Sequence, residues 1–205
     1  MLCYYRGMIK AFLFDNGGVM TSGGAGNELA ERLANNLGIN EVKAWSLLKQ
    51  VFDEYIKGKL TEPELWRIVE NHYGKPISVD KRDIWNKWED MRPLPEMMDL
   101  VRKLKTKGYK VGLLSNVIPN TERVIRANGG YDNFDFLVLS CEVGFSKPDP
   151  EIYAIAMNHL DGIKPNEVAF LDDQERCLVP ARELGMETIL VNSPTQAIAE
   201  VQKLL

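Results

Sequence analysis

The sequence predicts an α/β fold: a doubly wound parallel sheet of the Rossmann type, with an inserted all-helical unit. Short apolar runs typical of buried strands alternate with helical patterns through the second half of the chain. A long helical stretch without a convincing strand interrupts this alternation after the first apolar run. The chain has 205 residues, 45% of them hydrophobic and 26% charged, which is ordinary globular composition and enough for one core plus an insertion.

The predicted strands are five short runs rich in apolar and β-branched residues. They lie at residues 9–14, 110–114, 136–139, 168–171 and 188–191. Continuous apolar runs, without alternation of polar residues, are typical of strands covered on both faces. Parallel strands covered on both faces by helical crossovers form a sheet whose sites lie beyond the carboxyl ends of the strands.

Helical patterns separate the later strands. One apolar stripe runs from Met97 to Leu104 and another from Ile152 to Leu160, and each is followed by a glycine. The last helix is predicted to begin at Ser193, where an N-cap, a proline at the first helical position and Gln196 as a capping partner coincide. Asp149 and Pro150 predict the start of an earlier helix in the same way.

The insertion is predicted to hold several helices between the first strand and a proline pair at residues 93–95. Its first two apolar stripes lie at residues 29–37 and 45–56, and Thr61 with Glu64 predicts a capping box for a third helix. Asp80 is predicted to cap a fourth helix bearing Ile84, Trp85 and Trp88. We therefore expect a core domain of residues 1–20 and 93–205, with residues 21–92 forming a helical cap over the end of the first strand.

Charge and residue counts exclude several classes of function. The net charge is −4 and no stretch is densely basic, so we expect no nucleic-acid partner and no anionic membrane surface as a partner. Cys3, Cys141 and Cys177 are odd in number and far apart, which fits neither a disulfide framework nor a zinc site and predicts reduced thiols. The apolar run at residues 11–14 is too short for a membrane span and lacks the pattern of a signal peptide, so we expect a cytosolic protein. His72 and His159 both lie in helical patterns and are expected to be structural. Whether residues 1–7 belong to the native start stays open, because Met8 directly precedes the first strand.

Polar side chains follow the ends of four apolar runs. They are Asp15, Ser115, Asn116, Lys147, Asp172 and Asp173. Because the carboxyl ends of parallel strands meet at one edge of a sheet, we expect these side chains to surround one small volume. Four of them have a plainer interpretation: a turn residue for Asp15, a helix cap for Ser115 and Asn116, and a solvated loop charge for Lys147.

This set of residue types suits the transfer of a phosphoryl group beside a divalent cation. Mg²⁺ prefers hard oxygen ligands, including one or two carboxylates. Asp15 can offer one oxygen to the metal and attack phosphorus with the other, which splits hydrolysis into formation and breakdown of an aspartyl phosphate. Lys147 would neutralise the crowded charge, and Ser115 and Asn116 would donate hydrogen bonds to the phosphoryl oxygens.

Four segments in order also resemble the haloacid dehalogenase-like superfamily of aspartate-nucleophile hydrolases. They are FLFDNGGV at residues 12–19, LSN at 114–116, GFSKPDPEIY at 144–153 and FLDD at 170–173. The last third of the chain is especially similar to the phosphatase domain of soluble epoxide hydrolases, and bacterial sugar-phosphate phosphatases are similar too. The resemblance covers nearly the whole chain.

The resemblance implies a role for each matching position. Asp15 is the implied nucleophile and a metal ligand, Ser115 binds phosphate, Lys147 is the stabilising cation, and Asp173 is a metal ligand. A main-chain carbonyl at Gly17 completes the implied Mg²⁺ site, and an all-helical cap is implied for the insertion. We expect a Mg²⁺-dependent phosphatase acting on a small phosphorylated metabolite.

Two positions depart from the family pattern. Phosphatases of the superfamily usually carry a second Asp two residues after the nucleophile, which serves as general acid and base, and here that position is Gly17. General acid-base help is worth roughly 10² to 10⁴-fold, although the glucose-1-phosphate phosphatase group resembles this chain in having glycine there. Cys177 stands where Asp or Asn is usual. We therefore expect a weakened hydrolase that prefers good leaving groups, such as anomeric sugar phosphates or acyl phosphates.

Two alternatives remain at this point. A metal-independent 2-haloacid dehalogenase would use Asp15 to attack carbon, but it would gain nothing from the acidic pair Asp172 and Asp173. A catalytically idle member that binds a phosphorylated ligand or a protein partner is compatible with Gly17 and Cys177. The sequence identifies neither the physiological substrate nor the oligomeric state, because the orientation of the cap side chains is not readable.

Overall fold

The sheet confirms the predicted parallel α/β class. The structure is a computed structural model that describes residues 8–23, 26–85 and 87–205. Its strands are β1 (Ala11–Phe14), β2 (Lys110–Ser115), β3 (Phe136–Leu139), β4 (Val168–Asp172) and β5 (Glu187–Leu190). They pair in the order β3-β2-β1-β4-β5, and every pair is parallel. The central position of β1 places its carboxyl end between those of β2 and β4.

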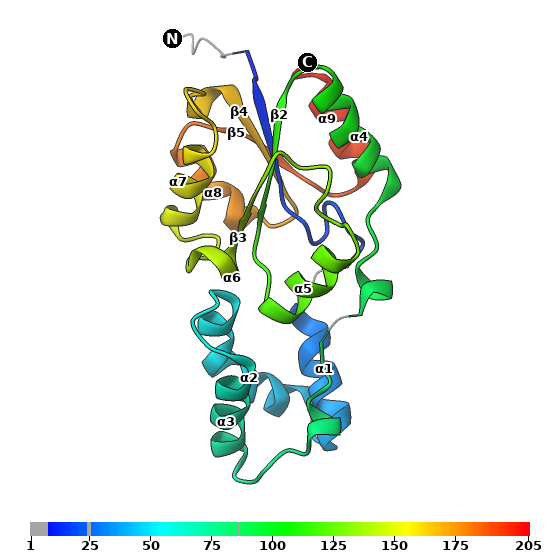
Figure 1. The fold of residues 1–205 in the computed structure, drawn as a ribbon, viewed down its shortest axis with the longest axis vertical. Coiled ribbons are helices and arrows are strands. Elements are labelled where there is room, and N and C mark those ends of the chain that lie inside the picture. The colour runs from blue at the N-terminus through cyan, green and yellow to red at the C-terminus, as the bar shows by residue number, and fades with distance from the viewer. Residues whose placement is uncertain (1–7, 24–25, 86) are drawn as a thin grey trace.

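Helices cover both faces of this sheet (Figure 1). One face carries α4 (Pro95–Thr106) and α9 (Pro194–Gln202), and the other carries α7 (Pro150–Asn158) and α8 (Glu175–Glu183). Alternate residues of β1 serve the two layers, with Phe12 and Phe14 facing α4 and α9, and Ala11 and Leu13 facing the opposite layer. Burial on both faces explains why the strands are apolar throughout.

Shorter elements complete the core beside the carboxyl ends of the strands. They are α5 (Pro119–Ala127) and α6 (Ser140–Val143), whereas the 3₁₀ turn η3 (Pro165–Glu167) directly precedes β4 and lies at the opposite, amino end of the strands. At α9 the predicted start is confirmed, since the Ser193 hydroxyl accepts a hydrogen bond from the Gln196 main-chain N–H at 3.2 Å. Asp149 is the N-cap residue of α7, but its carboxylate does not cap that helix and instead forms an ion pair with Lys57 at 3.1 Å.

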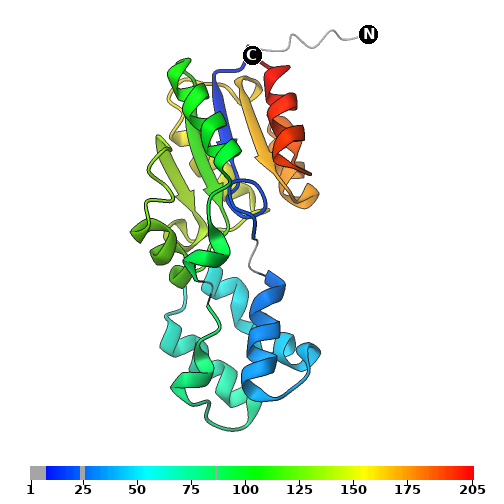
Figure 2. The ribbon, with the colours of Figure 1, turned by 90° about the vertical axis from the view of Figure 1, so that its right-hand side faces the viewer.

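The inserted segment folds as a helical unit with its own apolar core (Figure 2). It contains α1 (Gly26–Leu37), α2 (Glu41–Ile56), α3 (Glu62–Tyr73) and the 3₁₀ turns η1 (Val79–Arg82) and η2 (Trp88–Met91). The predicted capping box is present at the start of α3, where the main-chain N–H and the hydroxyl of Thr61 donate to the Glu64 carboxylate at 2.8 and 2.7 Å.

The fourth helix predicted for this unit is wrong. Residues 79–82 and 88–91 form the two short 3₁₀ turns, and Ser78, not Asp80, precedes the first of them. Side-chain contacts with α3 fix this path: Arg82 pairs with Glu70 at 2.8 Å, and the Trp85 indole donates to Glu62 at 2.7 Å. Tertiary contacts of this kind override local helix propensity.

The helical unit lies beyond the carboxyl ends of the strands and contacts the core there (Figures 1 and 2). Ser140 donates a hydrogen bond to the main-chain oxygen of Ile56 at 2.7 Å. Gly58 approaches the core so closely that a Cβ would lie 2.0 Å from the carbonyl oxygen of Cys141. The two connecting segments meet at a bridge between Thr21 and Pro93. These contacts hold the unit over the edge where the predicted site residues gather.

Within the described residues, no helix is long and apolar enough to span a membrane. Cys3 and the segment 1–7 lie outside the described residues.

Candidate active site

A cavity of about 410 Å³ opens at the carboxyl ends of β1, β2 and β4, beneath the helical unit. It brings together the predicted residues except Asp172, which is completely buried behind Lys147. The residues from the core that line it include Asp15, Gly17, Ser115, Asn116, Lys147 and Asp173. Phe52 and Ile56 line it from the helical unit. Parallel topology thus gathers groups that are up to 158 positions apart in the chain, from residue 15 to residue 173.

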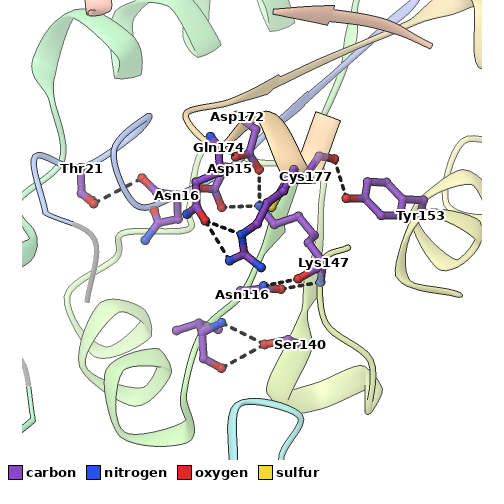
Figure 3. Close-up of polar contacts among 12 residues, drawn as sticks. Asp15, Asn16, Thr21, Asn116, Ser140, Lys147, Tyr153, Asp172, Gln174 and Cys177 are labelled. Atoms are coloured by element: carbon purple, nitrogen blue, oxygen red, sulfur yellow. Dashed lines mark hydrogen bonds and ion pairs between the residues drawn. The ribbon is translucent and has the colours of Figure 1, made fainter. Parts of the chain in front are cut away.

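A buried ion-pair cluster forms one wall of the cavity (Figure 3). The Lys147 ammonium group lies 2.7 Å from Asp15 Oδ1 and 2.6 Å from Asp172 Oδ2. Their side chains are 2%, 8% and 0% exposed, in that order, so solvent does little to screen these charges. One cation thus holds two carboxylates.

Burial and charge change the pKa values of this cluster. Burial raises the pKa of Asp15 to about 6, with Lys147 opposing the rise and Asp172 adding to it. Burial alone would lower the pKa of Lys147, but Asp15 and Asp172 outweigh that effect and the net shift is upward. At neutral pH Lys147 is therefore charged and Asp15 is ionised.

Asp173 lines the cavity as an exposed residue, and it is not one of the two carboxylates that pair with Lys147. Burial, followed by the charge of Asp172, raises the pKa of Asp173. Gly18, at φ +75°, allows the close approach of Asp173 to the loop after β1, because a Cβ there would lie 2.3 Å from Asp173 Oδ2. Only glycine fits this position. The oxygens of Asp15, Asp172 and Asp173 can lie within 4.8 Å of one another, the spacing of a carboxylate site for a metal ion.

Asn116 uses its side chain to hold the loop that carries Lys147 (Figure 3). Its amide group donates to the Lys147 carbonyl at 2.8 Å and accepts from the Lys147 main-chain N–H at 2.7 Å. The side chain is therefore occupied, and the group that Asn116 could offer to a ligand is its main-chain N–H. Ser115 is buried and lines the same cavity.

The loop after β1 is fixed by its own hydrogen bonds. The Asn16 carbonyl accepts from the main-chain N–H groups of Met20 and Thr21 at 2.8 and 2.9 Å, and the Thr21 hydroxyl donates to it at 3.3 Å. Gly17 lies in this loop and lines the cavity. Its position brings no carboxyl side chain to the site.

Cys177 lines the cavity as a buried thiol. Burial raises the pKa of the Cys177 thiol to about 11, although Lys147 acts in the opposite direction. The carbonyl oxygen of Cys177 accepts a hydrogen bond from the Tyr153 hydroxyl at 2.6 Å (Figure 3). The protonated thiol is a neutral part of the wall at physiological pH.

Several cavity residues were not predicted from the sequence. Among them are Thr21, Met91, Thr121, Gln174 and Arg176. A signal existed for the last two, since they lie one and three positions after Asp173, beyond the end of a predicted strand. His72 bonds to the Ile68 carbonyl at 2.8 Å and His159 stacks on Phe136, both outside this cavity.

Known proteins are similar to this chain in sequence. Bifunctional epoxide hydrolase 2 of Mus musculus is 50% identical over 166 residues, which cover 74% of this chain and 30% of that protein. The match to the epoxide hydrolases of pig, rat and mouse covers only 20% to 30% of their length. Glyceraldehyde 3-phosphate phosphatase of Methanothermobacter thermautotrophicus is 32% identical over 202 residues, 91% of this chain and 87% of that protein.

A solved structure shows the same fold with ligands bound. A haloacid dehalogenase family enzyme from Bacteroides thetaiotaomicron, in complex with magnesium and inorganic phosphate, has a TM-score of 0.71 and 28% identity. The alignment covers 88% of this chain and 93% of that one. The family model of the haloacid dehalogenase-like hydrolases matches residues 9–185. The resemblance inferred from the motifs is thus confirmed, and this chain belongs to the haloacid dehalogenase-like hydrolases.

Proposed function

We propose that this hydrolase is a Mg²⁺-dependent phosphatase that cleaves a small phosphorylated metabolite through an aspartyl phosphate on Asp15. The observation that carries the proposal is the buried Lys147, held between Asp15 and Asp172 beside the cavity that Asp173 also lines. Two similar proteins support it, a glyceraldehyde 3-phosphate phosphatase and an enzyme solved with magnesium and inorganic phosphate.

The donor set of the site fits Mg²⁺. Asp15 gives one oxygen to Lys147 and keeps the other, and Asp173 lies close enough to share a metal ion with it. Asp172 is already committed, because its oxygens accept from Lys147 and from the Gln174 main-chain N–H at 2.8 Å. Asp15, Asp173 and the Gly17 carbonyl would therefore hold the ion. When bound, Mg²⁺ would offset the negative charge of the phosphoryl oxygens and of the nearby carboxylates.

The first half of the reaction forms a bond between Asp15 and phosphorus and breaks the bond from phosphorus to the ester oxygen, which leaves as an alkoxide and takes a proton from water. An ionised Asp15 is the nucleophile, and Lys147 opposes the charge that develops on the phosphoryl group. The Ser115 hydroxyl and the Asn116 main-chain N–H would donate to the phosphoryl oxygens. In the second half, water attacks phosphorus and Asp15 leaves as a carboxylate.

The leaving alcohol must depart without a proton from position 17. Gly17 supplies no general acid, and the pKa of Cys177, about 11, makes its thiol a weak one. We therefore propose that the enzyme favours leaving groups stable as anions, such as those of acyl phosphates and anomeric sugar phosphates.

Residues 21–92 act in this proposal as a cap domain over the core of residues 1–20 and 93–205. Phe52 and Ile56 of α2 contribute apolar lining to the cavity from the helical unit, while the charged groups come from the core. A lining of this kind selects the non-reacting part of a substrate and excludes water. The cytosolic location stays a prediction from the sequence.

The test is release of phosphate from p-nitrophenyl phosphate and acetyl phosphate, with Mg²⁺ and with EDTA. The proposal predicts turnover in Mg²⁺ and none in EDTA. Chloride release from 2-chloropropionate in EDTA, without phosphatase activity, would instead identify a dehalogenase. Phosphate binding by folded protein that turns over neither class of substrate would identify an idle binding protein.

A further inference from the structure

Arg176 lines the active-site cavity from the first turn of α8, and none of the roles above uses it. Its guanidinium group is oriented by Gln174, whose side-chain oxygen accepts from Nε at 3.0 Å and from Nη2 at 2.8 Å. The main-chain N–H of Gln174 is in turn bonded to Asp172 at 2.8 Å. The segment that carries Asp173 therefore also fixes Arg176 relative to the site.

The charge of Arg176 has no carboxylate counterpart in the described part of the chain. Gln174 is neutral. The neighbouring acid Glu175 accepts hydrogen bonds from Arg182 on both carboxylate oxygens, and the distance from Arg182 Nη2 to Glu175 Oε2 is 2.9 Å. Lys147, the other cation of the cavity, already faces Asp15 and Asp172. Arg176 thus presents a positive charge to the cavity, with the edge that carries Nη1 unused by Gln174.

The cavity is large enough for more than a phosphoryl group. Its volume is about 410 Å³, and Phe52, Ile56 and Met91 give it an apolar side. The non-reacting part of a substrate would lie between this side and Arg176. A guanidinium group binds a carboxylate or a phosphate through two parallel hydrogen bonds, which neutral groups do not match.

We propose that Arg176 determines specificity by binding a second anionic group, carried on the alcohol part of the substrate. The substrate class is then a small phosphomonoester that bears a carboxylate or a second phosphate. This inference rests on the proposed phosphatase function and names the substrate class of the same site.

The kinetic test compares esters that differ in the second anion. The substrates are 2-phosphoglycolate for a carboxylate, propane-1,3-diol bisphosphate for a second phosphate, and 2-hydroxyethyl phosphate as the neutral match. We expect the wild type to prefer at least one of the anionic esters, and Arg176→Gln to lower kcat/KM for that ester by about ten- to a hundredfold. The variant should leave 2-hydroxyethyl phosphate and p-nitrophenyl phosphate unchanged. The preference should also weaken as salt rises.

The matched control is Arg102→Gln. Arg102 lies on α4, on the opposite face of the sheet from α8, and its exposed side chain pairs with Asp99. This variant makes the same change in net charge and should keep the wild-type preference. An equal loss on all esters in Arg176→Gln would place its action on the phosphoryl group or on folding, and would overturn the inference. A wild type that hydrolyses p-nitrophenyl phosphate but does not prefer the anionic esters would also overturn the inference. That result would leave the phosphatase proposal intact.

Binding of non-hydrolysable analogues separates the two proposals. Titration calorimetry with Mg²⁺ would compare 3-phosphonopropionate with propylphosphonate on the wild type and on Arg176→Gln. If the wild type binds 3-phosphonopropionate more tightly than propylphosphonate and Arg176→Gln does not, the inference is supported. If that result comes with no turnover of any ester, only the phosphatase proposal fails. Equal affinities, or no binding of either analogue, overturn it. Far-UV circular dichroism checks that the variant is folded.

Discussion

Removing the charge of Lys147 would expose the buried carboxylates on which the site depends. In Lys147→Met, Asp15 and Asp172 lose an ammonium group that lies 2.7 and 2.6 Å away. The carboxylate side chains are 8% and 0% exposed, so water cannot take its place. Breaking a buried ion pair by removing one partner costs about 3–5 kcal/mol. We expect the free energy of unfolding of the metal-free protein to fall by that amount at pH 7.

The pH dependence of this loss has a definite sign. Lys147 lowers the pKa of Asp15, so its removal makes the folded state hold a proton at a pH where the unfolded chain has lost it. A folded state that binds more protons becomes less stable as pH rises. The difference in stability between wild type and variant should therefore grow from pH 5 to pH 8.

The assay is urea unfolding in EDTA, followed by tryptophan fluorescence and by far-UV circular dichroism. Lys57→Met is the control, because Lys57 pairs with Asp53 and Asp149, whose side chains are 68% and 35% exposed. Such pairs contribute less than about 1 kcal/mol. Equal losses in the two variants, or a Lys147→Met protein as stable as the wild type at pH 8, would refute the reasoning.

Three further predictions concern single positions of the site. Gly17→Asp should raise kcat/KM for alkyl phosphates by about 10² to 10⁴-fold and for aryl phosphates far less, and φ at Gly17 is not positive, so the backbone conformation suits Asp; equal gains on both esters would contradict this. Asp15→Asn should raise the free energy of unfolding of the metal-free protein in urea above pH 6 by about 2–3 kcal/mol, because burial raises the pKa of Asp15 to about 6. This gain in stability should fade as pH falls towards 3.8, the ordinary pKa of Asp. A gain that does not depend on pH would argue against this explanation. Iodoacetamide at pH 8 should leave Cys177 unmodified until urea unfolds the chain, because burial raises the pKa of its thiol to about 11; peptide mass spectrometry decides this.

The strands were predictable because burial on both faces requires a continuous run of apolar residues, which is visible in the sequence. The apolar run at residues 136–139 coincides with β3, and the other runs match their strands to within two residues at each end. The site was predictable for the same reason, since a polar residue after such a run must lie at the carboxyl edge of a parallel sheet. The order of the strands in the sheet was not predictable, because an apolar run does not show which other strands it pairs with.

What the sequence could not show depends on contacts between distant segments. The failed fourth helix is an example, because Trp85 binds Glu62, and nothing local to residues 79–91 reveals that partner. Asn116 was predicted to donate a hydrogen bond to phosphate, but the sequence did not show which of its groups is available; in the structure its side-chain amide holds the main chain of Lys147, which lies 31 positions later. The orientation of Arg176 towards the cavity likewise became visible only in the structure.

The most direct test of the account is to trap the phosphoryl group on Asp15. The wild type would be mixed with acetyl phosphate and Mg²⁺, quenched in acid within one turnover, and digested for peptide mass spectrometry, beside Asp15→Asn. We predict one phosphoryl group on the wild-type peptide that contains Asp15, and neither this adduct nor Mg²⁺-dependent phosphate release in the variant. Turnover that survives in Asp15→Asn, or a phosphoryl group on another residue, would contradict the account.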